Sequence, residues 1–272
     1  MDTEKKYLIT TLVIITIVFT RSTLAQASEE ANAKELAMKL ANPVSSLISV
    51  PFQNSSDIGI GDYKGTRNTL NIQPVVPASL TNDINLVTRV ILPVVTQQNI
   101  TGVGESEAGL GDAVVSMFFN PADSKEGFTW GAGPVFLVPT GTNDFLTTRK
   151  FGIGPTVVAL QQTGGSTFGA LINQIWSVAG DNDRANISAL YFQPFYSFNW
   201  ESGAGVAVDF EISQNWKAST TTVWFIPTIS SLASLGGQKV QFIIGPRINL
   251  AAPDGAQADF GVRAQLVFLF PR

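Results

Sequence analysis

The sequence predicts a closed antiparallel transmembrane β-barrel of about twelve strands. From residue 45 onward, apolar and polar residues alternate over stretches of about ten residues, and turn residues separate these stretches. Charged residues make up 14% of the chain, against about 25% in an ordinary soluble protein. After residue 27, no stretch is long and apolar enough to cross a membrane as a helix, which takes about 20 residues. A barrel with an apolar outer face and a polar, weakly charged inner face accounts for all three observations.

The first 27 residues have the three parts of a secretory signal peptide. Lys5 and Lys6 supply the positive region, and an apolar run follows from Tyr7 to Phe19. Ala25-Gln26-Ala27 then offers a small-residue cleavage site. An uncleaved anchor helix is the alternative, but Arg21 interrupts a run that is already short for a span. Export of a barrel predicts the outer membrane of a Gram-negative bacterium as its location.

Residues 28–44 are expected to form a short segment in front of the barrel, which spans residues 45–272. Within this segment, residues 28–42 are predicted to be helical, because Leu36 and Leu40 lie four residues apart and Pro43 follows. The pattern leaves three places open for the segment. It can plug the barrel, lie in the periplasm, or form a disordered tail.

The clearest predicted strand runs from Gly205 to Trp216. Successive side chains of a strand point to opposite faces, so the alternation separates an apolar face from a polar one. The apolar face carries Val206, Val208, Phe210 and Ile212, and the other face carries Ala207, Asp209, Glu211, Ser213 and Asn215. All predicted strands are 46–57, 70–76, 84–92, 109–120, 127–139, 151–162, 166–179, 186–199, 205–216, 220–233, 239–250 and 257–270.

A soluble β-sandwich would show the same alternation, with its apolar face inside. The barrel is favoured because the polar face carries few charges, several strands are long, and aromatic residues lie near strand ends. Aromatic girdles at the two membrane interfaces are typical of barrels in lipid. The residues assigned to these girdles are Trp130, Tyr191, Trp200, Trp216 and Trp224.

The chain contains neither cysteine nor histidine. The lack of cysteine excludes disulfides and thiolate metal sites, and the lack of histidine removes the usual general base and the commonest metal ligand. The sequence therefore argues against an enzyme and predicts no cofactor and no metal. The net charge of −4 without a basic patch argues against nucleic acid as a partner. The expected partners are the lipid bilayer, the barrel-assembly machinery during biogenesis, and a small solute.

Short motifs spread over nearly the whole mature chain resemble a known family. They include Leu47-Ile48-Ser49-Val50-Pro51-Phe52-Gln53-Asn54, Gly109-Leu110-Gly111-Asp112, Phe118-Phe119-Asn120-Pro121, Trp130-Gly131-Ala132-Gly133-Pro134, Asn173-Gln174-Ile175-Trp176 and Leu269-Phe270-Pro271. The sequence resembles the Gram-negative outer-membrane barrels labelled "transporter", often mislabelled neuromedin U, which are related to outer-membrane proteins of the phenol-degradation meta-pathway. The resemblance implies the fold and the location, and it makes small, partly hydrophobic molecules a reasonable solute class. The end Phe270-Pro271-Arg272 departs from the terminal aromatic residue of many such barrels.

Eight charged residues are predicted to line the lumen if the apolar positions face lipid. The pleat requires this placement, because an arginine or lysine that faces lipid at the midplane costs about 2–4 kcal/mol. These residues either pair as a polar network that fills the lumen, or line an aqueous path that selects solutes. They are Arg89, Asp112, Asp209, Glu211, Lys239, Arg247, Asp259 and Arg263.

Two further patterns could indicate other chemistry. Asp209 and Glu211 share a strand face, as the two carboxylates of a hydrolase would, but no nucleophile motif accompanies them, and lining the lumen is favoured. Gly109-Leu110-Gly111-Asp112 and Gly152-Ile153-Gly154-Pro155 complete no phosphate-binding motif. Glycines within strands more often mark bends or close backbone approach.

Three functions are therefore compared. The leading hypothesis is a passive channel for small solutes. The second is a closed structural or surface-interaction barrel whose lumen is plugged by residues 28–44 and paired charges. The third, an outer-membrane enzyme, is disfavoured by the missing histidine.

Overall fold

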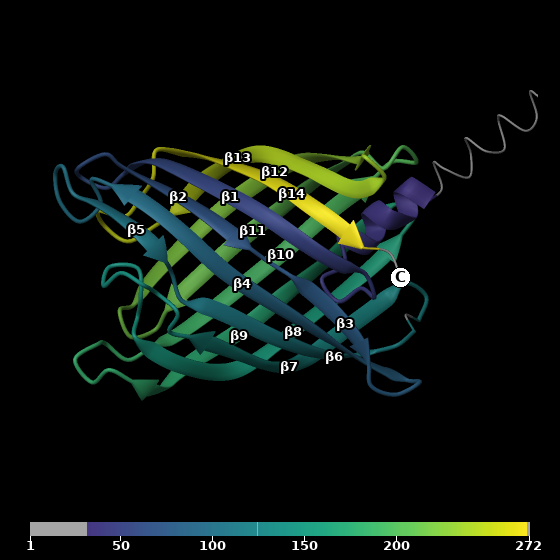
Figure 1. Ribbon diagram of the computed structural model, residues 1–272, viewed down its shortest axis with the longest axis horizontal. Coiled ribbons are helices and arrows are strands. Elements are labelled where there is room, and N and C mark those ends of the chain that lie inside the picture. Colours follow the sequence, from purple (N-terminus) through teal and green to yellow (C-terminus); the bar gives the residue numbers. More distant parts are fainter. Residues whose placement is uncertain (1–31, 124, 271–272) are drawn as a thin grey trace, which may run out of the picture.

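The computed structural model describes residues 32–123 and 125–270, which form one closed β-barrel with a short helix at one end (Figure 1). The signal peptide predicted over residues 1–27 lies outside the described residues. Within them, no helix is both long and apolar enough to cross a membrane. The strand segments are β1 (Ile48–Ile60), β2 (Gly65–Ile72), β3 (Val75–Ser79), β4 (Ile84–Gln98), β5 (Ser106–Leu110), β6 (Ala113–Pro121), β7 (Phe128–Val138), β8 (Lys150–Thr163), β9 (Ser166–Gly180), β10 (Ser188–Asn199), β11 (Gly205–Asn215), β12 (Thr220–Leu235), β13 (Gln238–Ala251) and β14 (Phe260–Phe270).

The barrel has twelve strands, and all of its pairings are antiparallel. It closes where β1 pairs with β14, from Ile48↔Phe270 to Ile58↔Phe260. Two strands are each broken into two segments: β2 and β3 both pair with β1 and β4, while β5 and β6 both pair with β4. The predicted closed barrel of about twelve strands is confirmed.

Both breaks occur where proline removes a backbone donor. Pro74 separates β2 from β3, and its missing N–H leaves a gap in the ladder. Gly111 and Asp112, which separate β5 from β6, lie beside Pro93 of β4, whose carbonyl accepts from the Gly111 N–H at 2.9 Å. The strand predicted over 109–120 is therefore broken into two segments, and β4 extends to Gln98, beyond its predicted end at residue 92.

Alternation along the strands separates the two faces as predicted. On β13, Ile244 and Ile248 are exposed on the outside, whereas Gln241, Arg247 and Asn249 are buried inside. Trp130, Trp200 and Trp216 are exposed, as expected of aromatic girdles.

Two of the residues assigned to the girdles are placed differently. Trp224 lies opposite Glu211 on the inner face, and the guanidinium of Arg247 stacks 4.1 Å from its ring centre. Tyr191 also points inward, where its hydroxyl donates to Gln193 at 3.2 Å. Their assignment to the girdles is wrong because residues two positions apart in a strand share a face, and the neighbours of Tyr191 and Trp224 at that spacing face the lumen.

Glycine permits close backbone approach at the predicted sites. A Cβ at Gly154 of β8 would lie 1.7 Å from the carbonyl oxygen of Gln174 on β9. The Gly152-Ile153-Gly154-Pro155 motif is therefore part of a strand wall, in agreement with its interpretation as a close-approach site.

The N-terminal segment, residues 32–47, lies at the end of the barrel where β14 also ends (Figure 1). Its helix covers residues 32–40. Leu36 and Leu40 pack against a cluster of Leu47, Val267 and Leu269, which lies inside the barrel. These contacts place the predicted amphipathic face of the helix against the inner wall.

Val44 inserts further, into an apolar patch on the inner wall. It is 2% exposed and packs in one cluster with Val87, Phe118, Val158, Leu160 and Leu171. The inner face is thus apolar on this side rather than uniformly polar. Val44 covers this apolar patch.

Candidate functional site

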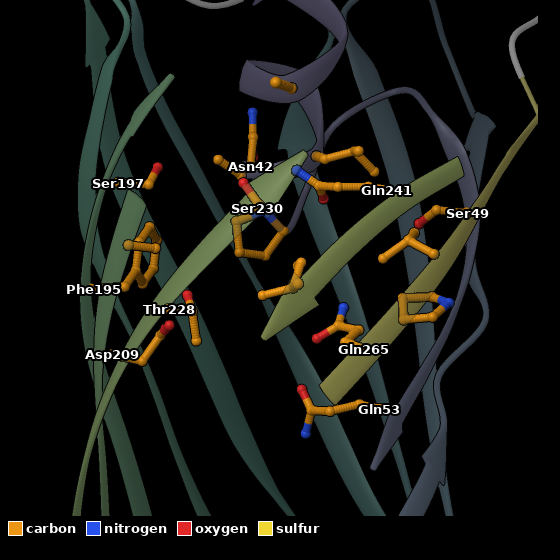
Figure 2. A pocket seen from close by; sticks show the side chains of 18 of the residues that line it. Asn42, Ser49, Gln53, Phe195, Ser197, Asp209, Thr228, Ser230, Gln241 and Gln265 are labelled. Carbon is orange, nitrogen blue, oxygen red and sulfur yellow. The ribbon is translucent and has the colours of Figure 1, made fainter. Parts of the chain in front are cut away.

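A cavity of about 230 Å³ lies inside the barrel, beside the N-terminal segment (Figure 2). Phe195 and Asp209 stand on one wall, and Gln53 and Gln265 stand on the facing wall. Asn42 lines the end that is nearest to the helix. The cavity therefore has both apolar and hydrogen-bonding surfaces.

The strand pleat determines which side chains reach the cavity. On β10, every second residue faces it, from Gln193 through Phe195 and Ser197 to Asn199. On β12 the same rule selects Thr228 and Ser230, and on β14 it selects Arg263, Gln265 and Val267. Of the eight residues that the sequence predicts for the lumen, Arg89, Asp209 and Arg263 are part of this lining.

A network of buried ion pairs lies on the far side of the cavity from the N-terminal segment. β1 runs away from that segment, so Asp57 lies beyond the cavity residues Ser49 and Gln53. Asp57 accepts two hydrogen bonds from Nη1 of Arg247, at 2.7 and 2.8 Å. Glu211 accepts from Arg263 at 2.7 and 3.2 Å and lies 3.7 Å from Nη2 of Arg247.

This network joins four strands across the inside of the barrel. Asp57 is on β1, Glu211 on β11, Arg247 on β13 and Arg263 on β14. The two arginines are each 6% exposed. Because β1 and β14 form the closing seam, the network bridges the two ends of the barrel sequence with charge-assisted hydrogen bonds.

Five of the eight predicted lumen residues come together here. Arg247, Arg263 and Glu211 belong to the network, and Arg89 and Asp209 line the cavity next to it. Nη2 of Arg89 donates to Gln73 at 2.7 Å, and Asp209 accepts from Gln193 at 3.0 Å. Among residues 32–123 and 125–270, neither Arg89 nor Asp209 has an ion-pair partner within 4.0 Å.

The carboxylates of Asp209 and Glu211 do not form a hydrolase pair. One binds a glutamine amide and the other binds two guanidinium groups, so they have separate partners and separate environments. This geometry supports the assignment of both to the lumen lining.

The other three predicted residues lie away from the cavity. Asp112 accepts from Gly141, Thr147 and Thr148 and thereby holds the loop between β7 and β8. Asp259 forms an exposed ion pair with Lys64 at 2.9 Å. Lys239 is exposed beside the turn between β12 and β13.

Several inward polar residues were missed by the sequence prediction. One of them is Asp57. Three others form a separate series of hydrogen bonds, in which Arg67 donates to Gln97 at 2.9 Å and Gln97 donates to Glu107 at 3.0 Å. Asp57 carried a usable signal, because it shares the polar face of its strand with Gln53 and Ser55. Arg67 and Glu107 lay outside the predicted strand boundaries.

The fold resembles that of a solved outer-membrane channel. The crystal structure of the COG4313 outer membrane channel from Pseudomonas putida F1 has a TM-score of 0.66 at 16% identity, over 82% of this chain and 94% of that chain. OmpT from Vibrio cholerae matches more weakly, with a TM-score of 0.38 at 7% identity, over 82% of this chain and 98% of that chain. No curated protein matches the sequence. Residues 49–269 match the family described as "Putative MetA-pathway of phenol degradation", and the chain belongs to this family.

Proposed function

We propose that this protein is a passive outer-membrane channel for small, partly hydrophobic solutes, including aromatic ones. A closed barrel with an apolar outer face satisfies its backbone hydrogen bonds internally, as lipid requires. The family description refers to phenol degradation, and the similar structure from Pseudomonas putida is that of a channel. The proposed activity needs no cofactor, no energy input and no bond chemistry.

The observation that carries the proposal is the cavity inside the barrel. It combines Phe195 and Val267 with amide and hydroxyl groups, which suits solutes that are neither fully apolar nor strongly charged. It lies between the N-terminal segment and the ion-pair network, so a solute that crosses the lumen must pass both.

A closed barrel is the second candidate, and the packing of the N-terminal segment favours it. Val44 is buried in the wall cluster, Gln162 donates to the carbonyl of Met38 at 2.8 Å, and Asn120 donates to the carbonyl of Val44 at 3.3 Å. The two candidates differ in whether this segment leaves the lumen.

A reversible tether separates them, because the native chain has no cysteine. A Cβ at Gly131 would lie 3.2 Å from Cγ1 of Val44, the position that a cysteine sulfur takes. A Val44→Cys/Gly131→Cys pair is therefore within reach of a disulfide, whose S–S bond is about 2.05 Å long. The double variant is refolded into a planar bilayer and its current is recorded before and after reduction. The two single-cysteine variants serve as controls.

The channel proposal expects little current from the oxidised barrel and discrete, salt-dependent steps after reduction. Deletion of residues 28–44 should produce the largest current. If the reduced barrel carries no current and only the variant that lacks residues 28–44 conducts, the plugged barrel is favoured instead. If the folded deletion variant also carries no current, the channel hypothesis is rejected.

A further inference from the structure

Three glutamines form a row on the seam wall of the cavity. Gln53 on β1 is the direct cross-strand neighbour of Gln265 on β14. Gln241 on the adjacent β13 lies opposite Val267, which places it diagonally from Gln265. All three side chains point into the cavity (Figure 2).

The amide groups of these glutamines have no hydrogen-bond partner among the residues that the structure describes. Gln241 is only 5% exposed as a whole residue, but its amide atoms are not enclosed by protein and open onto the cavity. Other cavity glutamines are occupied, since Gln73 accepts from Arg89 and Gln193 donates to Asp209. The row therefore presents free donors and acceptors to whatever enters the cavity.

A further unpartnered donor is buried beside the cavity. Asn199 on β10 is 3% exposed, and its Nδ2 has no partner in the described part of the chain. It belongs to the wall that faces the glutamine row. This nitrogen has almost no accessible surface, so it does not face the cavity, and the glutamine row supplies the free hydrogen-bonding groups that a ligand can reach.

An aromatic ring and the size of the space complete the site. Phe195 stands between Ser197 and Asp209 on the wall opposite the glutamines (Figure 2). The cavity of about 230 Å³ exceeds the roughly 150 Å³ that holds benzene in a protein interior. It is smaller than the roughly 300–1,000 Å³ typical of sites for drug-sized ligands. One substituted ring fits within this volume.

We propose that the cavity binds one neutral, single-ring aromatic solute that carries hydroxyl groups, and that Gln53, Gln241 and Gln265 recognise those hydroxyls. The ring packs on Phe195, and the amides donate to and accept from the hydroxyl oxygens. Amides suit a neutral ligand because they offer both donors and acceptors without charge. The inference rests on the proposed function, since a solute must enter the lumen to be bound.

The test compares two probes of the same shape. Hydroquinone has two hydroxyls where p-xylene has two methyl groups. Binding of each to the full mature protein in lipid nanodiscs is measured by equilibrium dialysis, and binding to empty nanodiscs is subtracted. Saturable binding with a clear preference for hydroquinone is expected, and this comparison needs no substitution.

The variants Gln241→Met and Gln265→Met keep the side-chain shape and remove the amide. Each should weaken hydroquinone binding by roughly three- to tenfold, the loss of about one hydrogen bond, and leave p-xylene binding unchanged or tighter. Gln98→Met is the matched control, because Gln98 is exposed at the far end of β4. Phe195→Ala should weaken the binding of both probes. Heat-modifiable migration on gels establishes that each variant is folded.

Equal affinity for the two probes, no saturable binding, or equal effects of the amide and control variants would each overturn the site. If the barrel conducts but binds both probes equally, the binding site is rejected and the channel hypothesis stands. If the barrel prefers hydroquinone but never conducts, the binding site stands and the channel hypothesis is rejected.

Discussion

At the scale of single residues, the inside of the barrel contains both paired and unpaired charges. Glu211 is held by two arginines, and Asp57 by one. A buried pair contributes little net stability compared with apolar packing, but loss of one partner is expensive because the other charge remains buried. The ion-pair network therefore stabilises the seam chiefly through the cost of breaking it.

Arg263→Met should lower the free energy of unfolding by about 3 kcal/mol, because Glu211 then retains only the longer contact to Arg247. The double variant Arg263→Met/Glu211→Gln should recover most of this loss, since no carboxylate is left unpaired. Urea unfolding in lipid vesicles measures both. Additive destabilisation in the double variant would contradict a coupled pair.

Arg89 differs, since its hydrogen bond is to the neutral Gln73. Arg89→Gln removes one positive charge from the lumen without breaking an ion pair. In a conducting preparation, the reversal potential in a salt gradient should move toward cation selectivity. Lys239→Gln at the exposed turn is the control and should shift it less. An unchanged potential after the Arg89 substitution would mean that ions do not pass this residue.

At the scale of elements, Asp112 joins a strand break to a loop. The carboxylate accepts from the backbone of Gly141 and Thr148 and from the hydroxyls of Thr147 and Thr148. The same loop carries Arg149, which forms ion pairs with Asp144 and with Asp181 of the next loop. The pKa of the Asp181 carboxyl is lowered because the backbone N–H of Asp183 donates to it, with a further contribution from Arg149.

Asp112→Ala should loosen the loop at residues 139–149 while the barrel remains closed, because the loop loses four hydrogen bonds to one carboxylate. Trypsin should then cleave after the exposed Arg149 several times faster than in the unsubstituted protein. Asp254→Ala, in a turn at the same end of the barrel, should leave that rate unchanged. Equal cleavage rates in all three proteins would show that Asp112 does not order the loop.

At the scale of the whole molecule, the outer face must match a bilayer. Ile244 lies in the middle of β13 and is exposed on the outside, whereas Leu235 is exposed beside the turn to β13. Arginine at the midplane of a barrel costs about 2–4 kcal/mol, and arginine near an interface about 0–1 kcal/mol.

Ile244→Arg should therefore destabilise the barrel in lipid far more than Leu235→Arg. The measurement is the free energy of unfolding from lipid vesicles, with the unsubstituted protein alongside. Equal costs at the two positions would contradict the placement of the membrane around the middle of β13.

The sequence predicts those structural features that depend on neighbouring residues better than those that depend on residues far apart in the chain. Strand alternation depends on neighbouring residues, and it assigned Arg247, Arg263 and Glu211 to the strand faces that carry the ion-pair network. The girdle assignment failed for Tyr191 and Trp224, because proximity to a strand end does not tell which face a residue occupies. The sequence left the place of residues 28–44 open, since nothing local distinguishes a plug from a free helix.

The sequence by itself determined the fold class, the approximate strand segments and the separation of an apolar face from a polar one. These follow from a side-chain period of two, which each strand expresses independently. Only the tertiary structure decided the partners: Asp57 binds Arg247 across 190 positions of the chain, and Val44 covers a wall built from β4, β6, β8 and β9. Closing the barrel brings these residues together, and that closure depends on the register of all its strands at once.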